Sequence, residues 1–193
     1  MTFDDGTETE VGATQIADFT LFAGREISAE EYAELRESAA LGSSKVRAMR
    51  ILGSRNMSAR QVEERLVSKG ESSEIARETV EWLERIGAVN DEEYASAIVR
   101  HYIAKGYGLA RIKSELFKRG IERDLWEKAL SDLEGMEEAA FDFVVNKLQG
   151  AHGKDDIRRA TNALLGRGYS YDEVRAAVRR YLEETGDTMD GEE

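Results

Sequence analysis

The 193-residue chain contains no cysteine and no proline. The lack of cysteine excludes a disulfide framework, a thiolate metal site and a cysteine nucleophile, and it fits a reducing cytosol. Proline makes up about 5% of ordinary proteins, so its absence over this length is informative. Because proline removes a backbone donor and clashes with the preceding helical turn, its absence favours helices joined by glycine turns.

Long hydrophobic runs are missing as well. No apolar stretch approaches the roughly 18 residues of a transmembrane helix, so no membrane contact is expected. Residues 1–10 are acidic and polar and lack the basic and apolar regions of a signal peptide. We therefore expect a cytoplasmic protein. Apolar residues make up 41% of the chain, which is enough to build a core.

Charge is distributed unevenly along the chain. Residues 1–42 carry ten acids and two bases, and residues 183–193 carry six acids and no base. The middle, residues 43–182, has 23 acids and 25 bases. One interpretation is that this mildly basic middle meets a polyanion or an acidic groove. The other is that these are ordinary solvated helix faces with solubilising ends, since the excess of base is small beside a usual phosphate-binding footprint.

Helical signals dominate from residue 45 onward. Ser28 with Glu31, and Ser58 with Gln61, form capping boxes that predict helix starts. Five glycines stand where an apolar period stops and are expected to end helices in the left-handed conformation: Gly70, Gly87, Gly106, Gly120 and Gly168. The segment 41–44 is expected to close the first helix as a linker. In residues 11–24, apolar and polar residues alternate imperfectly, as they would in a strand. The sequence is compatible there with a short hairpin or with disorder.

An internal repeat is the strongest single feature of the sequence. An apolar residue is followed by a leucine four places on, then a basic residue and a glycine, over residues 62–70, 112–120 and 160–168. Each copy is flanked by further apolar stripes of helical period. The expected fold is all-α, an elongated array of three tandem three-helix repeats, because stacking supplies the apolar area that each small unit lacks. The alternative is one compact bundle whose helices resemble one another by chance.

The predicted organisation has five parts. Residues 1–42 form an acidic N-terminal extension with a short helix near 28–40. Three three-helix repeats follow over 45–88, 89–134 and 135–182, and residues 183–193 form an acidic tail.

A search for catalytic or metal-binding motifs yields none. His101 and His152 lack partners at metal-ligand spacing. Gly153 and Lys154 are followed by Asp155, which does not match a phosphate-binding loop, and residues 106–108 are interpreted as a turn between helices. Glu115 and Arg119 are interpreted as a solvated pair on a helix surface. We expect no cofactor, no metal and no enzymatic activity.

Several segments, taken in order, resemble the RecX family. They are residues 45–55 with Ser58, 62–70, 86–95, 105–108 followed by 111–121, and 167–174. The resemblance covers roughly residues 26–182. Ala160 replaces a larger apolar residue, the segment 150–154 is loop-like, and the first 25 residues are not explained by it.

The resemblance implies a function. RecX-like proteins lie along the groove of the RecA–DNA filament, bridge neighbouring subunits and inhibit strand exchange, ATP hydrolysis and the coprotease function. It therefore implies a regulator of DNA repair and of the SOS response whose partner is the RecA filament, with single- or double-stranded DNA as a further partner and the protein itself a monomer.

Basic residues on the inner side of the array are the candidate contacts with RecA or DNA. They are Arg47, Arg50, Arg55, Lys69, Arg100, Lys105, Arg111, Lys113, Lys118, Arg119, Arg158, Arg159, Arg167, Arg175 and Arg179. Two alternatives remain: a helical module that binds DNA directly, without RecA, and a helical-repeat scaffold for another protein. Steep salt dependence on bare DNA would favour the first. Absence of RecA from the bound fraction would favour the second.

Overall fold

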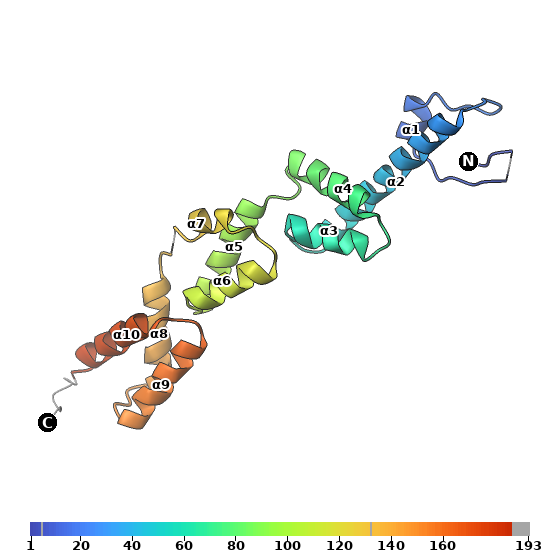
Figure 1. The fold of residues 1–193 in the computed structure, drawn as a ribbon. Helices are drawn as coiled ribbons and strands as arrows, with labels where there is room; N and C mark the ends of the chain where they lie inside the picture. Colours follow the sequence, from blue (N-terminus) through green and yellow to red (C-terminus); the bar gives the residue numbers. More distant parts are fainter. Residues whose placement is uncertain (5, 132, 187–193) are drawn as a thin grey trace. The chain divides into compact units, whose positions relative to one another are not determined.

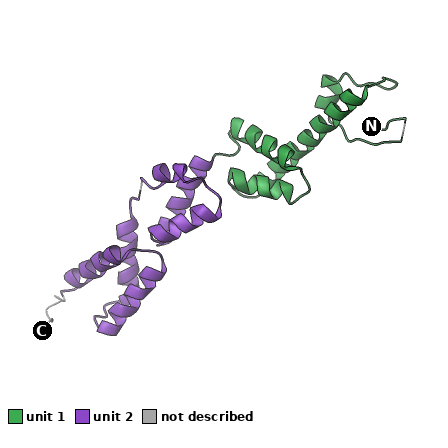
Figure 2. Ribbon diagram, viewed as in Figure 1, with its two compact units in different colours: residues 1–90 green, residues 91–193 purple. Residues whose placement is uncertain are grey.

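A computed structural model describes residues 1–4, 6–131 and 133–186 (Figure 1). The described residues form helices and connecting turns, and the only β pairing among them is an isolated bridge between Thr2 and Glu8. This confirms the predicted all-α class. The chain divides into two compact units, Met1–Asn90 and Asp91–Glu193, which are coloured separately in Figure 2. From residue 187 on, the predicted acidic tail lies outside the described residues.

The first unit contains helices α1 to α4. Their bounds are Ala13–Asp18, Ala29–Leu52, Ala59–Val67 and Ser73–Arg85. The capping boxes predicted at Ser28 and Ser58 are confirmed at the starts of α2 and α3. The C-terminal part of α2 packs with α3 and α4 around one hydrophobic core. Ser44 on α2 adds a buried hydrogen bond of 2.9 Å from the Thr79 hydroxyl of α4.

Two predictions for the N-terminal region are wrong. The segment 41–44 does not end a helix, because α2 continues without interruption from Ala29 to Leu52. Gly42 serves packing there, since a Cβ atom at this position would lie 3.2 Å from the Gln15 side chain. Residues 13–18 form a helix, not a hairpin, because Gln15 caps the backbone of Gly12 and its amide donates to Ser38 of α2.

The second unit contains helices α5 to α10. Their bounds are Asp91–Ala104, Leu109–Lys118, Asp124–Ala129, Met136–Leu148, Lys154–Gly166 and Tyr171–Glu184. Helices α5 to α7 surround one core of buried residues, and α8 to α10 surround another. The segment 150–154 is a connection between helices, as predicted, and the Tyr181 hydroxyl accepts a hydrogen bond of 2.9 Å from the Gly150 backbone.

The repeated sequence pattern corresponds to repeated burial. The apolar residue and the leucine of each copy are 0% exposed: Val62, Leu66, Ile112, Leu116, Ala160 and Leu164. The glycine that ends each copy has a positive φ of 97°, 70° or 92°. Residues that have a Cβ atom adopt this backbone conformation only with strain. Each core thus has a helix with the same buried face and the same kind of turn after it. The repeat boundaries themselves stay a prediction.

Two glycine turns of the second unit touch through their backbones. The turn between α5 and α6 lies against the turn between α9 and α10. The Gly108 N–H donates to the Arg167 carbonyl over 3.1 Å, and the Ala110 N–H donates to the Gly168 carbonyl over 3.0 Å. The Arg167 guanidinium crosses in the other direction and donates to the carbonyls of Lys105 and Gly106 over 3.0 and 3.2 Å.

This contact leaves no room for side chains at either glycine. A Cβ at Gly108 would lie 2.3 Å from the Tyr169 backbone nitrogen, and a Cβ at Gly168 would lie 2.6 Å from the Arg111 nitrogen. Gly108 is also the N-cap of α6, the position that Ser58 occupies before α3. A capping side chain is therefore absent at α6 because another backbone lies in its place.

We expect Gly108→Ala to destabilise the protein by about 1–3 kcal/mol, because the added methyl group must push two backbone segments apart. Gly166→Ala is the control. Gly166 lies in α9 with nothing within 4 Å of an added Cβ, and there alanine should stabilise by about 0.5–1 kcal/mol through helix propensity. Chemical denaturation measures both changes. Equal stability of the two variants would show that the turns do not pack this closely.

Candidate partner-binding surface

The most basic stretch of the second unit runs from α5 into α6. Between Arg100 and Arg119 there are six basic residues and one acid, Glu115. Helix α6 directs Ile112 and Leu116 into the core. The remaining faces are exposed, and they carry Arg111, Lys113 and Lys118, while Arg100 and Lys105 are exposed on and after α5.

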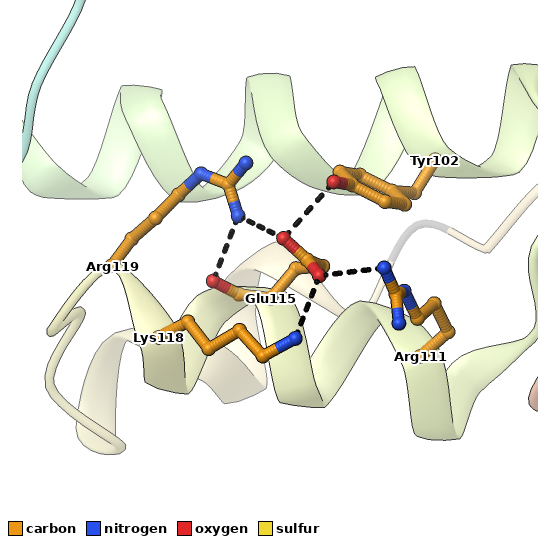
Figure 3. Close-up of polar contacts among 5 residues, drawn as sticks. All are labelled: Tyr102, Arg111, Glu115, Lys118 and Arg119. Atoms are coloured by element: carbon orange, nitrogen blue, oxygen red, sulfur yellow. Dashed lines mark hydrogen bonds and ion pairs between the residues drawn. The ribbon is translucent and has the colours of Figure 1, made fainter.

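Glu115 is the centre of this basic segment (Figure 3). It is only 6% exposed. Its Oε1 lies 3.1 Å from Arg111 Nη2 and 3.3 Å from Lys118 Nζ. Its Oε2 accepts from the Tyr102 hydroxyl over 3.0 Å and from the Arg119 guanidinium, which also donates to the Glu115 backbone carbonyl. One carboxylate therefore fixes three cations and a tyrosine from α5 and α6.

The same contacts set the protonation of Glu115. Hydrogen bonding from Arg119 is the largest cause, with Tyr102 and Lys118 adding to it, and together they lower the pKa of this carboxyl from 4.5 to about 2 against the opposing effect of burial. The interpretation of Glu115 and Arg119 as a solvated surface pair is thus wrong. Spacing at i and i+4 revealed the pair but not that the carboxylate faces α5, which depends on the packing of the two helices.

Arg167 is engaged within the chain. Besides its hydrogen bonds to the α5–α6 turn, its guanidinium carbon lies 5.2 Å from the Tyr107 ring centroid and 4.5 Å from the Phe143 ring centroid. A guanidinium between two aromatic rings makes favourable cation–π contacts. Among the candidate bases, Arg167 thus has a structural role in joining the two glycine turns.

Ion pairs or a contact with an aromatic ring engage a further group of the candidate bases. Arg47 on α2 pairs with Glu71 at 2.6 Å. Arg158 and Arg159 pair with Asp155 and Asp156 within the first turns of α9, and Arg175 lies over the Tyr171 ring at 5.1 Å. The exposed pairs of Arg158 and Arg159 contribute little to stability, so they leave these side chains available for other contacts.

Seven candidate bases have no ion-pair partner within the described part of the chain. They are Arg50, Arg55, Lys69, Arg100, Lys105, Lys113 and Arg179. All seven are exposed. Arg100, Lys105 and Lys113 belong to one contiguous stretch of sequence, next to the cations fixed around Glu115. The densest basic surface of the second unit therefore lies on α5–α6.

Over residues 1–4, 6–131 and 133–186, no three histidine or carboxylate side chains lie close enough together to hold a metal ion. No helix in these same ranges is both long and apolar enough to cross a membrane.

The fold and this surface define a class: an all-helical protein with three small cores, each surrounded by three helices, and a basic surface fixed by one buried acid. Residues 90–130 match the family described as RecX, second three-helix domain. That range contains the whole of α5–α7 and the Glu115 contacts.

Similar proteins extend the match beyond this domain. The regulatory protein RecX of Streptomyces coelicolor is 36% identical over 148 residues, covering 72% of this chain and 77% of the relative. That of Xanthomonas axonopodis pv. citri is 31% identical over 142 residues, covering 72% and 87%. The crystal structure of a regulatory protein RecX has a TM-score of 0.76 at 17% identity, covers 92% of this chain and 90% of that one, and supports the fold. The chain belongs to the RecX family of regulatory proteins.

Replacing Glu115 by glutamine should destabilise the folded protein by about 1–3 kcal/mol at neutral pH, because three cations lose the buried negative charge that they share. Glu122→Gln is the control, since Glu122 is exposed and a surface change of this kind stays within about 0.5 kcal/mol. Urea denaturation measures the difference. An effect of Glu115→Gln no larger than the control would contradict the assigned contacts.

The pH dependence of stability provides a second test. Because the pKa of Glu115 is lowered on folding, from 4.5 to about 2, its contribution is present above pH 4.5 and is lost as the pH falls toward 2. The stability difference between the wild type and Glu115→Gln should therefore be constant above pH 5 and shrink steadily between pH 4.5 and about 2. A difference that persists unchanged at about pH 2 would mean that the carboxylate is not held ionised.

Proposed function

We propose that this protein binds the RecA filament on DNA and inhibits strand exchange, ATP hydrolysis and the coprotease function, and so acts as a modulator of DNA repair and of the SOS response. Two observations support the proposal. The chain belongs to a family of regulatory proteins. It also carries a dense basic surface on α5–α6, which suits the phosphates and acidic side chains that a protein–DNA filament presents.

The observation that carries the proposal is the fixed geometry of this surface. Arg111, Lys118 and Arg119 are held on Glu115, so their side chains have already lost much of the freedom that binding would remove. Preordered side chains increase affinity because less conformational entropy is lost on association. The exposed Lys105 and Lys113 provide charge beside them that is not neutralised within the described chain.

Inhibition would follow from contact with more than one RecA subunit. Three three-helix repeats, over 45–88, 89–134 and 135–182, would place successive basic surfaces against neighbouring subunits. A protein that bridges subunits opposes the relative movements that strand exchange requires. It would act below one molecule per RecA, because each bridge restrains several subunits.

Charge reversal tests which surface is used. We expect Lys105→Glu with Lys113→Glu to weaken inhibition of RecA-driven strand exchange at least tenfold in the concentration required. These two lysines are chosen over Arg111 because Arg111 also pairs with Glu115, so that its reversal would disturb folding. The double variant should keep wild-type helicity by circular dichroism.

The matched control carries the same change of charge elsewhere. Arg77 on α4 and Lys154 at the start of α9 are exposed and are not among the candidate contacts. Arg77→Glu with Lys154→Glu should retain most of the inhibition. If both double variants lose inhibition equally, net charge and not the α5–α6 surface would be responsible.

Cosedimentation with RecA filaments, and with bare DNA across a salt series, separates the alternatives. Binding to filaments with little binding to bare DNA supports the proposal. Strong binding to bare DNA that falls steeply with salt would identify a direct DNA-binding protein instead. Absence of binding to either would favour a scaffold for a different partner.

A further inference from the structure

A small cavity lies between α8 and α10 in the second unit. Met136, Ala140 and Phe141 of α8 line one side of it, and Ala177 of α10 lines another. Its volume is about 150 Å³. A cavity of about this size with apolar walls can bind a molecule as large as benzene, whereas sites for drug-sized ligands measure roughly 300–1,000 Å³. The cavity therefore fits one aromatic ring or branched alkyl group and no larger cofactor.

Tyr169 forms part of the cavity wall, but its hydroxyl is buried beneath the surface. The tyrosine is 4% exposed and lines the cavity. Its hydroxyl is buried and has no hydrogen-bond partner among the described residues. Buried polar groups are nearly always hydrogen-bonded, so the free hydroxyl costs the folded protein stability. Burial, with the nearby Glu173 carboxylate, raises the pKa of Tyr169.

Two carboxylates and one guanidinium are among the groups that line the cavity. Glu137 and Glu173 both line it. Arg180 also lines it, but its guanidinium is already bound by Glu138 at 2.7 Å and by Glu184 at 2.9 Å. The guanidinium covers the Phe141 ring and so forms part of the apolar wall. The Glu137 and Glu173 carboxylates therefore attract a positively charged residue next to the group that enters the cavity.

We propose that this cavity binds an apolar anchor side chain of a protein partner, one that is followed by a lysine or arginine. Anchors that fill small, dry pockets contribute strongly to protein interfaces. The proposal goes beyond the RecA–DNA contact above, because none of the cavity residues belongs to the candidate basic set and no phosphate is involved.

Three capped dipeptides test the proposal on the intact protein: acetyl-Phe-Lys-amide, acetyl-Phe-Glu-amide and acetyl-Gly-Lys-amide. Binding is followed through the methyl resonance of Met136 in a titration to millimolar concentration. We expect acetyl-Phe-Lys-amide to shift this resonance in a saturable manner, acetyl-Phe-Glu-amide to bind at least threefold more weakly, and acetyl-Gly-Lys-amide to cause no shift. No saturable shift with the first peptide would overturn the proposal.

Two variants connect binding to the cavity itself. Ala177→Leu fills the cavity and should abolish the shift, whereas Ala104→Leu, at an exposed position at the end of α5, should leave it unchanged. Tyr169→Phe removes the buried hydroxyl. It should raise the melting temperature of the free protein, because an unpaired polar group is lost.

The opposite results are equally informative. A lower melting temperature of Tyr169→Phe would mean that trapped water already satisfies the hydroxyl. Peptide binding that survives Ala177→Leu would mean that the cavity is no anchor site. The Lys105→Glu and Lys113→Glu double variant should bind the peptide normally. Failure of the proposed RecA contact and failure of the cavity proposal can therefore be distinguished.

Discussion

The contact between two glycine turns is the constraint on which the second unit depends. Gly108 and Gly168 approach so closely that an added Cβ on either would collide with backbone. Because Gly108 is also the N-cap of α6, the contact determines where that helix begins and hence how its basic residues are directed. Arg167 strengthens the junction by bonding to two carbonyls of the facing turn. One steric requirement thus links the two helical cores of this unit to the orientation of its basic surface.

A basic surface on a short helix also requires a means of limiting repulsion. Like charges gathered on one short helix repel one another, and α6 carries Arg111 and Lys118 with Arg119 at its end. Glu115 resolves the conflict by accepting contacts from all three. Since Tyr102 of α5 occupies the remaining position on the carboxylate, the same group that neutralises the repulsion also ties α6 to its neighbouring helix.

Sequence reasoning predicted some parts of this arrangement and missed others. The positions that form the cores followed from periodicity, and Leu66, Leu116 and Leu164 are all fully buried as the repeat indicates. The role of Glu115 was missed because spacing along one helix does not show which side faces another. The Tyr169 cavity was missed for the same reason, since its walls come from two helices and a turn that are separated in sequence.

Side-chain period and local backbone conformation are enough to predict the helical class, the buried face of each repeated helix and the glycines that end them. Packing between distant segments is responsible for the uninterrupted course of α2, the helical form of residues 13–18 and the meeting of the two glycine turns. Each of these rests on a contact between residues distant along the chain: Gln15 with Ser38, Ser44 with Thr79, and Gly108 with Arg167. The intrinsic conformational preference of a few residues is weak. A close-packed tertiary contact can therefore override it at such places.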